Sequence, residues 1–458
     1  MKLTLKEVIQ AVSGNVIQAF EADLFLHGIG TDSRKIRQGE MFIPLVGQQF
    51  DGHDFIDTAI EKGAIAALWN RFKPIPEGIQ IPLILVDDTL KAFQDLACYY
   101  RNKINPKVVG VTGSNGKTTT KDLIASVLAT QYRVHKTKGN YNNHIGVPLT
   151  LLTMPEDTEI AVIEMGMSNR GEIEVLTQIA KPDIAVITNI GESHLQFLKT
   201  RENIAKAKLE ITEGLKENGV LILNGDEPLL RNALKKQNPP FQIRWVGTDR
   251  SNDRYPTEIN QALNEVQFKD SSDNEYSIPI IGIHNVINAL MAIEVGNQFS
   301  IPVYQIKEGL KHPELTSMRL EKIITKNGST LINDAYNASP TSMKASLELL
   351  TTLTQYKKRI AIIGDMFELG DQAEYYHIEI GRLCAELKID LLITTGNLAR
   401  LIANSAIEHG LRKDHVYHFQ NVDEIVPFIL HQSDQDSIIL VKASRGMHLE
   451  RVVQKLLN

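Results

Sequence analysis

The chain of 458 residues is about three times a typical domain length of roughly 150 residues, which excludes a single small module. Hydrophobic residues make up 43% and charged residues 23% of the composition, which excludes collagen-like and disordered chains. The formal net charge of −6 gives no general field that would attract a nucleic acid, so we expect an anionic ligand to be bound by local groups.

The cysteines and the apolar segments indicate the compartment. The two cysteines, Cys98 and Cys384, are too few for a disulfide framework and are not spaced as metal ligands, which favours a reducing environment. Lys6 and Glu7 stand where a secretory signal would need an unbroken apolar stretch. No segment reaches the ~18 apolar residues of a membrane span. We therefore expect a cytoplasmic protein without membrane insertion.

Three regions follow one another, and together they predict an α/β protein of three domains. Residues 1–84 contain short mixed segments and are expected to form a small N-terminal α/β domain. Residues 85–313 alternate apolar strands with helices, which is typical of a parallel sheet, and the polar insert at 248–278 is expected to add strands or loops. Residues 314–458 repeat the alternation and indicate a separate Rossmann-like domain. Three domains that meet imply a cleft.

A phosphate-binding loop is the strongest local signal. The segment Gly-Ser-Asn-Gly-Lys-Thr at 113–118 follows an apolar strand and opens an amphipathic helix, as a P-loop requires. Backbone N–H groups of such a loop bind phosphate oxygens, Lys117 would hold the terminal phosphates, and the Thr118 hydroxyl would bind Mg²⁺. No Asn-Lys-x-Asp guanine motif is present, so the sequence favours ATP over GTP.

The loop also leaves alternatives open. Val111 stands five residues before Gly116, where the general P-loop pattern has a glycine, so a chance Gly-Lys-Thr is one alternative. A dehydrogenase is a minor hypothesis, because the glycine pair of Gly28 and Gly30 is followed by Ser33 where a dinucleotide-binding motif needs its last glycine.

Polar residues at the carboxyl ends of the central strands are further candidates, since ligands of open parallel sheets bind there. Glu164 ends an apolar strand, at the place where a magnesium-associated carboxylate belongs in a P-loop domain. The alternative for Glu164 is an acid that caps the following helix. His194 lies six residues beyond Thr188, near the end of the next strand, and its alternative is a surface or structural histidine.

One lysine faces the core on the helix that the pattern predicts over residues 202–215. At about 100° per residue, Lys208 points along the apolar stripe of Ile204 and Ile211, whereas Lys206 points to solvent. An unpaired buried ammonium costs on the order of several kcal/mol, so we expect Lys208 to be paired, neutralised or chemically modified. The alternative is that its stem lies along the core while the amine reaches water.

Together these motifs resemble the Mur ligase family, whose members are ATP-dependent, amide-forming enzymes of peptidoglycan synthesis, and within it the branch that adds D-alanyl-D-alanine. The resemblance covers essentially the whole chain. It is carried by TDSR at 31–34, DGHDF at 51–55, GVTGSNGKTTT at 110–120, TKGNYNNHIGVPLTLL at 137–152, EMGMSNRGEI at 164–173, TNIGESHLQFL at 188–198, AKAKLEI at 205–211, GIHNVINAL at 282–290, NDAYNASPTSM at 333–343, GDMFELG at 364–370 and KASRGMHLERVV at 442–453.

The resemblance implies ATP and two Mg²⁺ ions as cofactors. Thr118 and Glu164 would hold the first ion, and His194 with a carbamylated Lys208, formed from CO₂, would hold the second. Lys117 and Arg319 would complete the catalytic set, with Arg319 reaching the γ-phosphate from the third domain. The implied ATP-binding residues are Gly113, Ser114, Asn115, Gly116, Lys117, Thr118, Thr119, Asn285, Asn288, Arg319, Asp334, Tyr336 and Asn337.

The resemblance also assigns residues to the two other substrates, and with them a role for each outer domain. The first domain would bind the UDP-linked precursor and the third the incoming dipeptide. The residues implied are Ser33 and Arg34 for the UDP part, Asn140 and Asn143 on a loop that faces substrate and phosphates, and Lys442, Ser444 and Arg445 near the dipeptide. Ser193, Gln196 and Ala443 depart from the family's commoner residues, which puts only the fine loop geometry in doubt.

The implied reaction joins D-alanyl-D-alanine to the terminal carboxylate of UDP-N-acetylmuramoyl-tripeptide through an acyl-phosphate, at the expense of ATP. The partners would be these small molecules, with no nucleic acid, and we expect a monomer. One alternative is another step of the family that adds diaminopimelate or lysine, although the Asp-Asn-Pro-Arg motif of that branch is absent. The other is a P-loop ATPase that is not a ligase. Whether the tripeptide carries diaminopimelate or lysine stays open.

Overall fold

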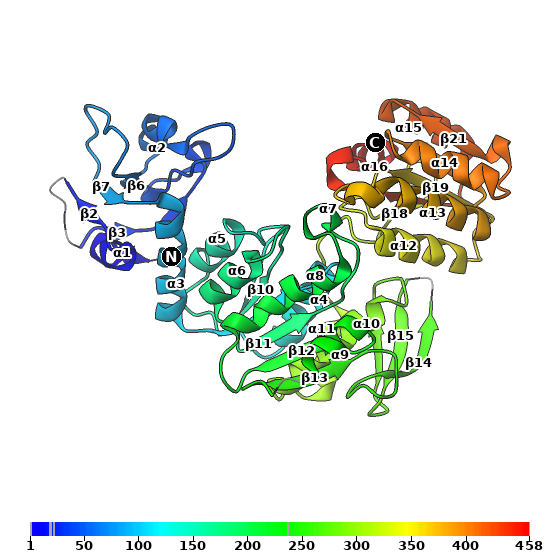
Figure 1. The fold of residues 1–458 in the computed structure, drawn as a ribbon, viewed down its shortest axis with the longest axis horizontal. Coiled ribbons are helices and arrows are strands. Elements are labelled where there is room, and N and C mark those ends of the chain that lie inside the picture. Colours follow the sequence, from blue (N-terminus) through cyan, green and yellow to red (C-terminus); the bar gives the residue numbers. More distant parts are fainter. Residues whose placement is uncertain (1, 18–20, 22, 236–237, 263, 458) are drawn as a thin grey trace.

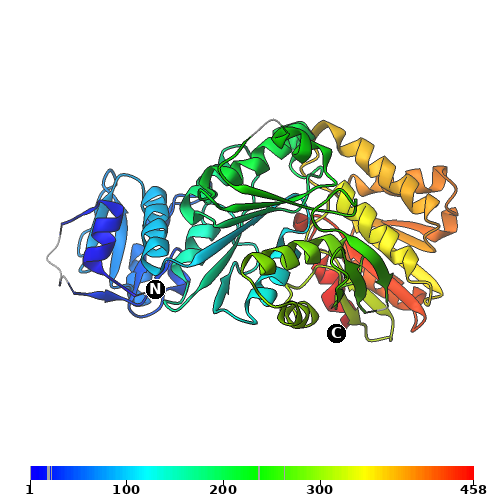
Figure 2. The ribbon, with the colours of Figure 1, turned by 90° about the horizontal axis from the view of Figure 1, so that it is seen from below.

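The computed structural model describes residues 2–17, 21, 23–235, 238–262 and 264–457. These residues form three lobes in a row, with the N-terminal and the third lobe at opposite ends of the central lobe in both views (Figure 1, Figure 2). Each lobe is built on a mostly parallel sheet covered by helices, which is the three-domain α/β architecture that the sequence predicted. Within the described residues, no helix is long and apolar enough to cross a membrane.

The N-terminal lobe contains a five-stranded sheet in the order β2-β7-β6-β5-β4, in which only β2 runs antiparallel to its neighbour. Its elements are β1 (Leu3–Thr4), α1 (Leu5–Val12), β2 (Asn15–Val16), β3 (Phe25–Leu26), β4 (Gly28–Gly30), η1 (Ser33–Lys35), β5 (Glu40–Phe42), η2 (Gly52–Phe55), α2 (Ile56–Glu61), β6 (Ala66–Asn70), β7 (Leu83–Val86) and α3 (Thr89–Ile104).

Alternate residues of these strands face opposite cores, as the twofold period of a strand requires. Leu68 of β6 packs in the same cluster as Phe93 of α3, whereas Trp69 packs with Ile56 of α2 on the other face. Strand β7 extends past residue 84, where the first domain was expected to end, because its residues pair with β6 through Val86. Helix α3 contacts both α1 and the central lobe, and so joins the two lobes.

The central lobe is built on a six-stranded, fully parallel sheet in the order β13-β12-β11-β8-β10-β9. Its strands are β8 (Lys107–Thr112), β9 (Val134–Lys136), β10 (Ile160–Glu164), β11 (Ile184–Ile187), β12 (Val220–Asn224) and β13 (Gln242–Val246). Its helices are α4 (Lys117–Leu128), α5 (Gly146–Leu152), α6 (Glu172–Ala180), α7 (Leu195–Leu198), α8 (Arg201–Leu209), η3 (Glu210–Gly214), α9 (Pro228–Leu234), α10 (Asn285–Gln298) and α11 (Val303–Lys311).

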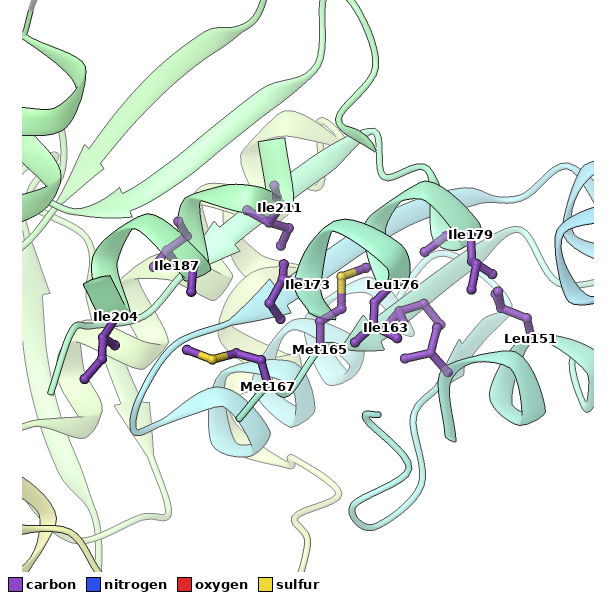
Figure 3. Packing of buried hydrophobic residues seen from close by; sticks show 14 of the residues in the cluster. Leu151, Ile163, Met165, Met167, Ile173, Leu176, Ile179, Ile187, Ile204 and Ile211 are labelled. Atoms are coloured by element: carbon purple, nitrogen blue, oxygen red, sulfur yellow. The ribbon is translucent and has the colours of Figure 1, made fainter. Parts of the chain in front are cut away.

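Helices cover both faces of this sheet, so its strands read as nearly continuous apolar runs. On one face Val109 and Val162 pack against α4 and α10. On the other face the side chains of β10, β11, α5, α6, α8 and η3 pack together, and Figure 3 shows Ile163 beside Leu176 and Ile187 near Ile204. Polar residues of this sheet therefore lie at the strand ends, outside the two hydrophobic cores.

The helix expected over 202–215 is shorter than predicted. Helix α8 ends at Leu209 and continues as the 3₁₀ turn η3. The carbonyl of Ile211 accepts a hydrogen bond from the Thr177 hydroxyl of α6 (2.9 Å), and a side chain at position 214 would lie 2.3 Å from the Thr177 carbonyl oxygen. Close packing on α6 thus replaces the last helical turn. Lys208 is buried, at 2% exposure, and Lys206 is exposed, as the helical pattern predicted.

The polar insert forms a three-stranded antiparallel sheet of β14 (Pro256–Gln261), β15 (Val266–Asp270) and β16 (Glu275–Ile278). A buried charge network ties it to the lobe. Arg254 donates to Asp270 of β15 and to Glu294 of α10 (Nε to Oε2, 3.0 Å), and Glu294 also accepts from Arg244 (2.9 Å). The insert is therefore part of the central lobe and not a loose decoration.

The third lobe has a six-stranded sheet in the order β17-β18-β22-β19-β20-β21, parallel except for the edge strand β17. Its elements are β17 (Glu321–Ile324), β18 (Thr330–Asn333), α12 (Pro340–Thr352), β19 (Lys358–Gly364), η4 (Gly370–Gln372), α13 (Ala373–Glu386), β20 (Leu391–Thr395), α14 (Ala399–Glu408), η5 (Lys413–His415), β21 (Val416–Phe419), η6 (Val422–Glu424), α15 (Ile425–Gln432), β22 (Ser437–Lys442), η7 (Arg445–Met447) and α16 (Glu450–Leu457). Helices again pack on both faces.

We predict that Asp270→Ala destabilises the protein by about 3–5 kcal/mol, because it leaves the buried Arg254 without this carboxylate. Urea unfolding followed by circular dichroism measures the change as a lower transition midpoint. Arg250→Ala, an exposed position in the same segment, is the matched control and should leave the midpoint unchanged. Equal midpoints for the wild type and Asp270→Ala would contradict the structural role of the network.

Candidate functional site

A cavity of about 430 Å³ lies where the central and third lobes meet. It gathers residues from the loop after β8, the ends of β10 and β11, the start of α10, and the third lobe. Among the residues that the sequence singled out, its lining includes Ser114, Asn115, Gly116, Lys117, Thr118, Thr119, Asn143, Glu164, His194, Asn285, Asn288, Arg319, Asp334, Tyr336, Asn337 and Lys442.

The loop at 113–118 is held in one conformation by the loop after β11. Gly113 has φ +150° and Gly116 φ +78°, and a side chain at position 113 would lie 1.8 Å from the Thr188 hydroxyl oxygen. Only glycine fits there. The backbone N–H of Asn115 donates to Oδ1 of Asn189 (2.8 Å), and Thr188 donates to the Asn115 carbonyl. These contacts fix the conformation of the loop.

Lys117, at the start of α4, is folded back on this loop. Its Nζ donates to the carbonyl oxygens of Gly113 (2.8 Å) and Ser114 (3.2 Å). Burial lowers the pKa of Lys117 to about 8, against an opposing effect of Glu164 and with a further lowering by Arg319. Among the described residues, no carboxylate pairs with this ammonium group, so it is available for an anion.

Two oxygen atoms of the cavity are buried without a hydrogen-bond partner among the described residues. They are Oγ1 of Thr118 and Oε2 of Glu164, whose residues are each 1% exposed. The other carboxylate oxygen of Glu164 accepts from Nδ2 of Asn142 (2.8 Å), and the Glu164 backbone N–H donates to Thr137 (3.0 Å). Buried oxygens cost free energy unless a donor or a cation satisfies them, and oxygen is the ligand that Mg²⁺ prefers. These two residues therefore fit a Mg²⁺ site.

Lys208 is the most perturbed cation near the cavity. No ion pair or hydrogen bond of its amine is found within the part of the chain that the structure describes. Burial, and to a smaller extent the charge of Lys117, lowers the pKa of Lys208 well below its usual value. A lowered pKa increases the fraction of neutral amine, which is the nucleophilic form of a lysine side chain.

His194 stands before α7 with φ +64°, and its Nδ1 lies 2.5 Å from Oε2 of Glu368 in the third lobe. Among the described residues there is no group of three or more His, Cys, Asp and Glu side chains that could hold a metal ion. Mg²⁺ at this place would therefore take its further oxygen ligands from Thr118, a modified Lys208, water or bound phosphate.

Two asparagines of α10 face the phosphate loop. Asn288 donates from Nδ2 to Oδ1 of Asn285 (2.8 Å) and accepts from the Thr120 hydroxyl (3.1 Å). A side chain at position 116 would lie 2.7 Å from Oδ1 of Asn288, so α10 and the loop are in direct contact. These amides form the wall of the cavity on the side of α10.

The third lobe contributes cations and an aromatic ring. The guanidinium carbon of Arg319 lies 4.1 Å from the centre of the Tyr336 ring, and its Nε is buried without a partner in the described chain. Its neighbours Met318 (φ +62°) and Leu320 (φ +52°) both have left-handed backbones, which only surrounding contacts can maintain. The strained segment before β17 thus aims Arg319 at the cavity.

Asp334 and Lys442 form a buried ion pair at the ends of β18 and β22. Asp334 also accepts from the Ser346 hydroxyl (2.8 Å), and Lys442 donates to the carbonyl of Asn337 (3.1 Å). The Lys442 ammonium is therefore compensated within the third lobe, unlike that of Lys117.

Seven predicted site residues are not among those that line the cavity, and one of them is Lys208, described above. Gly113 contributes its carbonyl to Lys117, as described above. Ser33 and Arg34 lie in the N-terminal lobe, after β4, where Arg34 forms a two-pronged ion pair with Asp32. The other residues are placed as follows: Ser444 is buried and accepts from the Phe367 N–H (2.8 Å), the guanidinium carbon of Arg445 lies 5.9 Å from the Tyr336 ring centre, and Asn140 is exposed.

Sequence reasoning missed several residues that hold the site together. Asn142, Thr137, Thr188 and Asn189 all follow strand ends, so the rule that found Glu164 could have found them. Glu368 is different, because its link to His194 crosses between lobes and leaves no local pattern in the sequence.

Known proteins match the chain over its full length. Three family models match it: the Mur ligase family catalytic domain over residues 25–101, the Mur ligase middle domain over 111–296, and the Mur ligase, glutamate ligase domain over 318–445. The UDP-N-acetylmuramoyl-tripeptide–D-alanyl-D-alanine ligase of Bacillus subtilis (strain 168) is 49% identical, with 100% of this chain and 99% of that protein covered.

Solved structures agree. A crystal structure of MurF from Acinetobacter baumannii is 31% identical, with a TM-score of 0.89 and coverage of 100% of this chain and 99% of that one. MurF ligase from Thermotoga maritima, solved in complex with ADP, is 27% identical, with a TM-score of 0.81 and coverage of 94% and 96%. These matches confirm the resemblance carried by the motifs, and the chain belongs to the Mur ligase family.

Proposed function

We propose that this chain is an ATP-dependent ligase that joins D-alanyl-D-alanine to UDP-N-acetylmuramoyl-tripeptide in the synthesis of peptidoglycan precursors. One observation carries the proposal. The same cavity is lined by the phosphate loop, by the unpartnered buried oxygens of Thr118 and Glu164, and by Arg319 of the third lobe. The activity named for the Bacillus subtilis relative, identical at 49% of positions, supports the choice of substrates.

The phosphate loop and α10 would hold ATP. The backbone N–H groups from Gly116 to Thr119 lie at the start of α4, where the helix dipole favours an anion. Asn285 and Asn288 would face the adenine side, and Asp334, Tyr336 and Asn337 would line the cleft opposite. Bound Mg²⁺ would neutralise phosphate charge, one ion held by Thr118 and Glu164 and a second by His194 and a carbamylated Lys208.

The reaction brings two anions together. The terminal carboxylate of the tripeptide attacks the γ-phosphorus of ATP and ADP leaves, and the dipeptide amine then displaces phosphate from the acyl carbon. Lys117 and Arg319 would offset the repulsion between carboxylate and γ-phosphate, since both are cations that face one cavity from different elements. Because Arg319 stands at the third lobe, docking of that lobe completes the site.

Lys208 is proposed to act as a carbamate. Its neutral amine adds to CO₂ and loses a proton, which turns a cationic group into an anionic oxygen ligand. The low pKa supports this step, because only the neutral amine has the lone pair that the reaction needs. The product also places an anionic group near the charge of Lys117.

The remaining assignments place each substrate on a lobe. We propose that the N-terminal lobe binds the UDP part through Ser33 and Arg34 after β4, that Asn140 and Asn143 face the growing peptide, and that Lys442, Ser444 and Arg445 after β22 meet the dipeptide. Since the three lobes of one chain supply all of these groups, we expect the monomer to be the working unit.

The direct test of this function is phosphate release from ATP with UDP-linked tripeptide and a panel of amines. We expect strong stimulation by D-alanyl-D-alanine and formation of the extended UDP-linked product, measured by mass spectrometry. Stimulation by free diaminopimelate or lysine on the shorter UDP-linked dipeptide, with none by D-alanyl-D-alanine, would reassign the step. Phosphate release that needs no amine would indicate an ATPase that is not a ligase.

Lys208→Ala should nearly abolish turnover, because it removes the amine that carries the carbamate, and added short carboxylic acids should restore part of the rate by supplying an oxygen ligand. Product formation at saturating substrates measures both effects. Lys206→Ala, exposed on the same helix, is the matched control and should behave as the wild type. Wild-type activity of Lys208→Ala would defeat the carbamate assignment.

Arg319→Ala should raise the barrier by roughly 3 kcal/mol, which is about a 100-fold loss of kcat, because one preorganised cation is lost from the developing phosphate charge. Steady-state kinetics with all three substrates measures this. The control is Lys344→Ala on α12, whose side chain is 61% exposed. An unchanged kcat in Arg319→Ala would show that this guanidinium does not act on the reacting phosphate.

A further inference from the structure

The loop after β19 of the third lobe reaches the loop after β11 of the central lobe. Oε2 of Glu368 lies 2.5 Å from Nδ1 of His194, and the backbone N–H of Gln196 donates to the Glu368 carbonyl (2.9 Å). The loop is the GDMFELG segment at 364–370, a motif to which the assignments above give no role. A two-point contact of this kind joins the predicted metal-binding histidine to the other lobe.

The third lobe holds this loop rigidly. The Asp365 carboxylate accepts from the backbone N–H groups of Asn397 (3.0 Å) and Ala399 (2.7 Å). The backbone N–H of Met366 donates to the buried His377 (3.0 Å). None of these bonds uses the carboxylate of Glu368, so the loop is anchored independently of the group that meets His194.

The backbone of the loop is shaped to make the contact. Glu368 has φ +62° and Gly370 has φ +59°, and a side chain at position 370 would come within 3.0 Å of the Gln196 Cα atom. A left-handed conformation is unfavourable for glutamate, and it persists only where the surroundings impose it. Such strain concentrates at functional sites, which indicates that the placement of Glu368 matters more than the local stability of the loop.

We propose that Glu368 is a positioning residue for His194, and that it acts only when the third lobe is docked on the central lobe. A neutral imidazole has one donor and one acceptor nitrogen, so a carboxylate at Nδ1 keeps the proton there and leaves the lone pair of Nε2 for a cation. The inference rests on the proposed function, in which His194 binds Mg²⁺. It adds that lobe docking itself aligns this ligand.

The charge of Glu368 suits this role. The Glu368 carboxylate faces the His194 ring from the other lobe, with Oε2 2.5 Å from Nδ1. The Glu368 side chain is 43% exposed, so its removal opens no core cavity. Substitutions at this position can therefore change the alignment of His194 without unfolding the lobe.

The test compares Glu368→Ala and Glu368→Gln with Glu374→Ala, an exposed control on α13. Two readouts are needed: steady-state kinetics, and binding of Mn²⁺ in the presence of a non-hydrolysable ATP analogue, followed by electron paramagnetic resonance without turnover. We expect Glu368→Ala to lose about 10- to 100-fold in kcat and in Mn²⁺ affinity, as loss of an outer-shell carboxylate does. The KM for ATP should change little, because the phosphate loop is untouched. Glu368→Gln, which keeps an acceptor oxygen, should lose less.

A double-mutant cycle separates positioning from a general structural role. Since Glu368 acts through His194, the double variant His194→Ala/Glu368→Ala should be no worse in kcat than His194→Ala alone. Additive losses would overturn the proposal, and so would wild-type kcat and Mn²⁺ affinity in both Glu368 variants. Either result leaves the proposed function intact, because that is judged by whether the wild type makes the dipeptide product. Conversely, a wild type that makes no such product would sink the proposed function, while the Mn²⁺ measurement still reports on the Glu368–His194 pair.

Discussion

The crowding of charge at the carboxyl edge of the central sheet is the constraint on which the rest of the site depends. Lys117 and Lys208 are close enough that the charge of Lys117 lowers the pKa of Lys208. Near them, Thr118 and Glu164 hold buried oxygens without partners. Such an arrangement is costly, since neighbouring buried lysines and buried oxygens without hydrogen-bond partners raise the free energy of the folded state. Anionic phosphates, their cations and a modified lysine would each reduce that cost.

The packing of helices on both faces of the central sheet explains why polar groups gather at this edge. Because helices cover both faces of the central sheet, the interior of each strand is apolar and the first positions free for polar groups are the ends of β8, β10 and β11. The third lobe then docks on the same edge. Ser339 donates to Oδ1 of Asn115 in the phosphate loop (3.1 Å), Thr341 bonds to Glu192, and Glu368 meets His194. The cavity therefore has one wall from the central lobe and one from the third lobe, and its shape depends on how these two lobes pack.

Local patterns predicted much of this correctly. The Gly-Lys-Thr segment between a strand and a helix indicated the phosphate loop in spite of its unusual spacing. The structure gives a reason for the first glycine of the loop, because Thr188 leaves no room for a side chain at position 113. The helical period placed Lys208 in the core. The same period failed at the end of its helix, because the Thr177 hydroxyl takes the Ile211 carbonyl and no pattern within the helix records that competitor.

By itself, the sequence determined the alternation of strands and helices, the position of the phosphate loop and the burial of single side chains, because each of these depends on residues within a few turns of one another. Only the tertiary structure decided which groups face each other across lobes. The contact of Glu368 with His194 and the electrostatic effect of Arg319 on Lys117 join segments distant in the chain. Such pairs depend on how the lobes pack against each other, and the local spacing of residues in the sequence does not determine that packing.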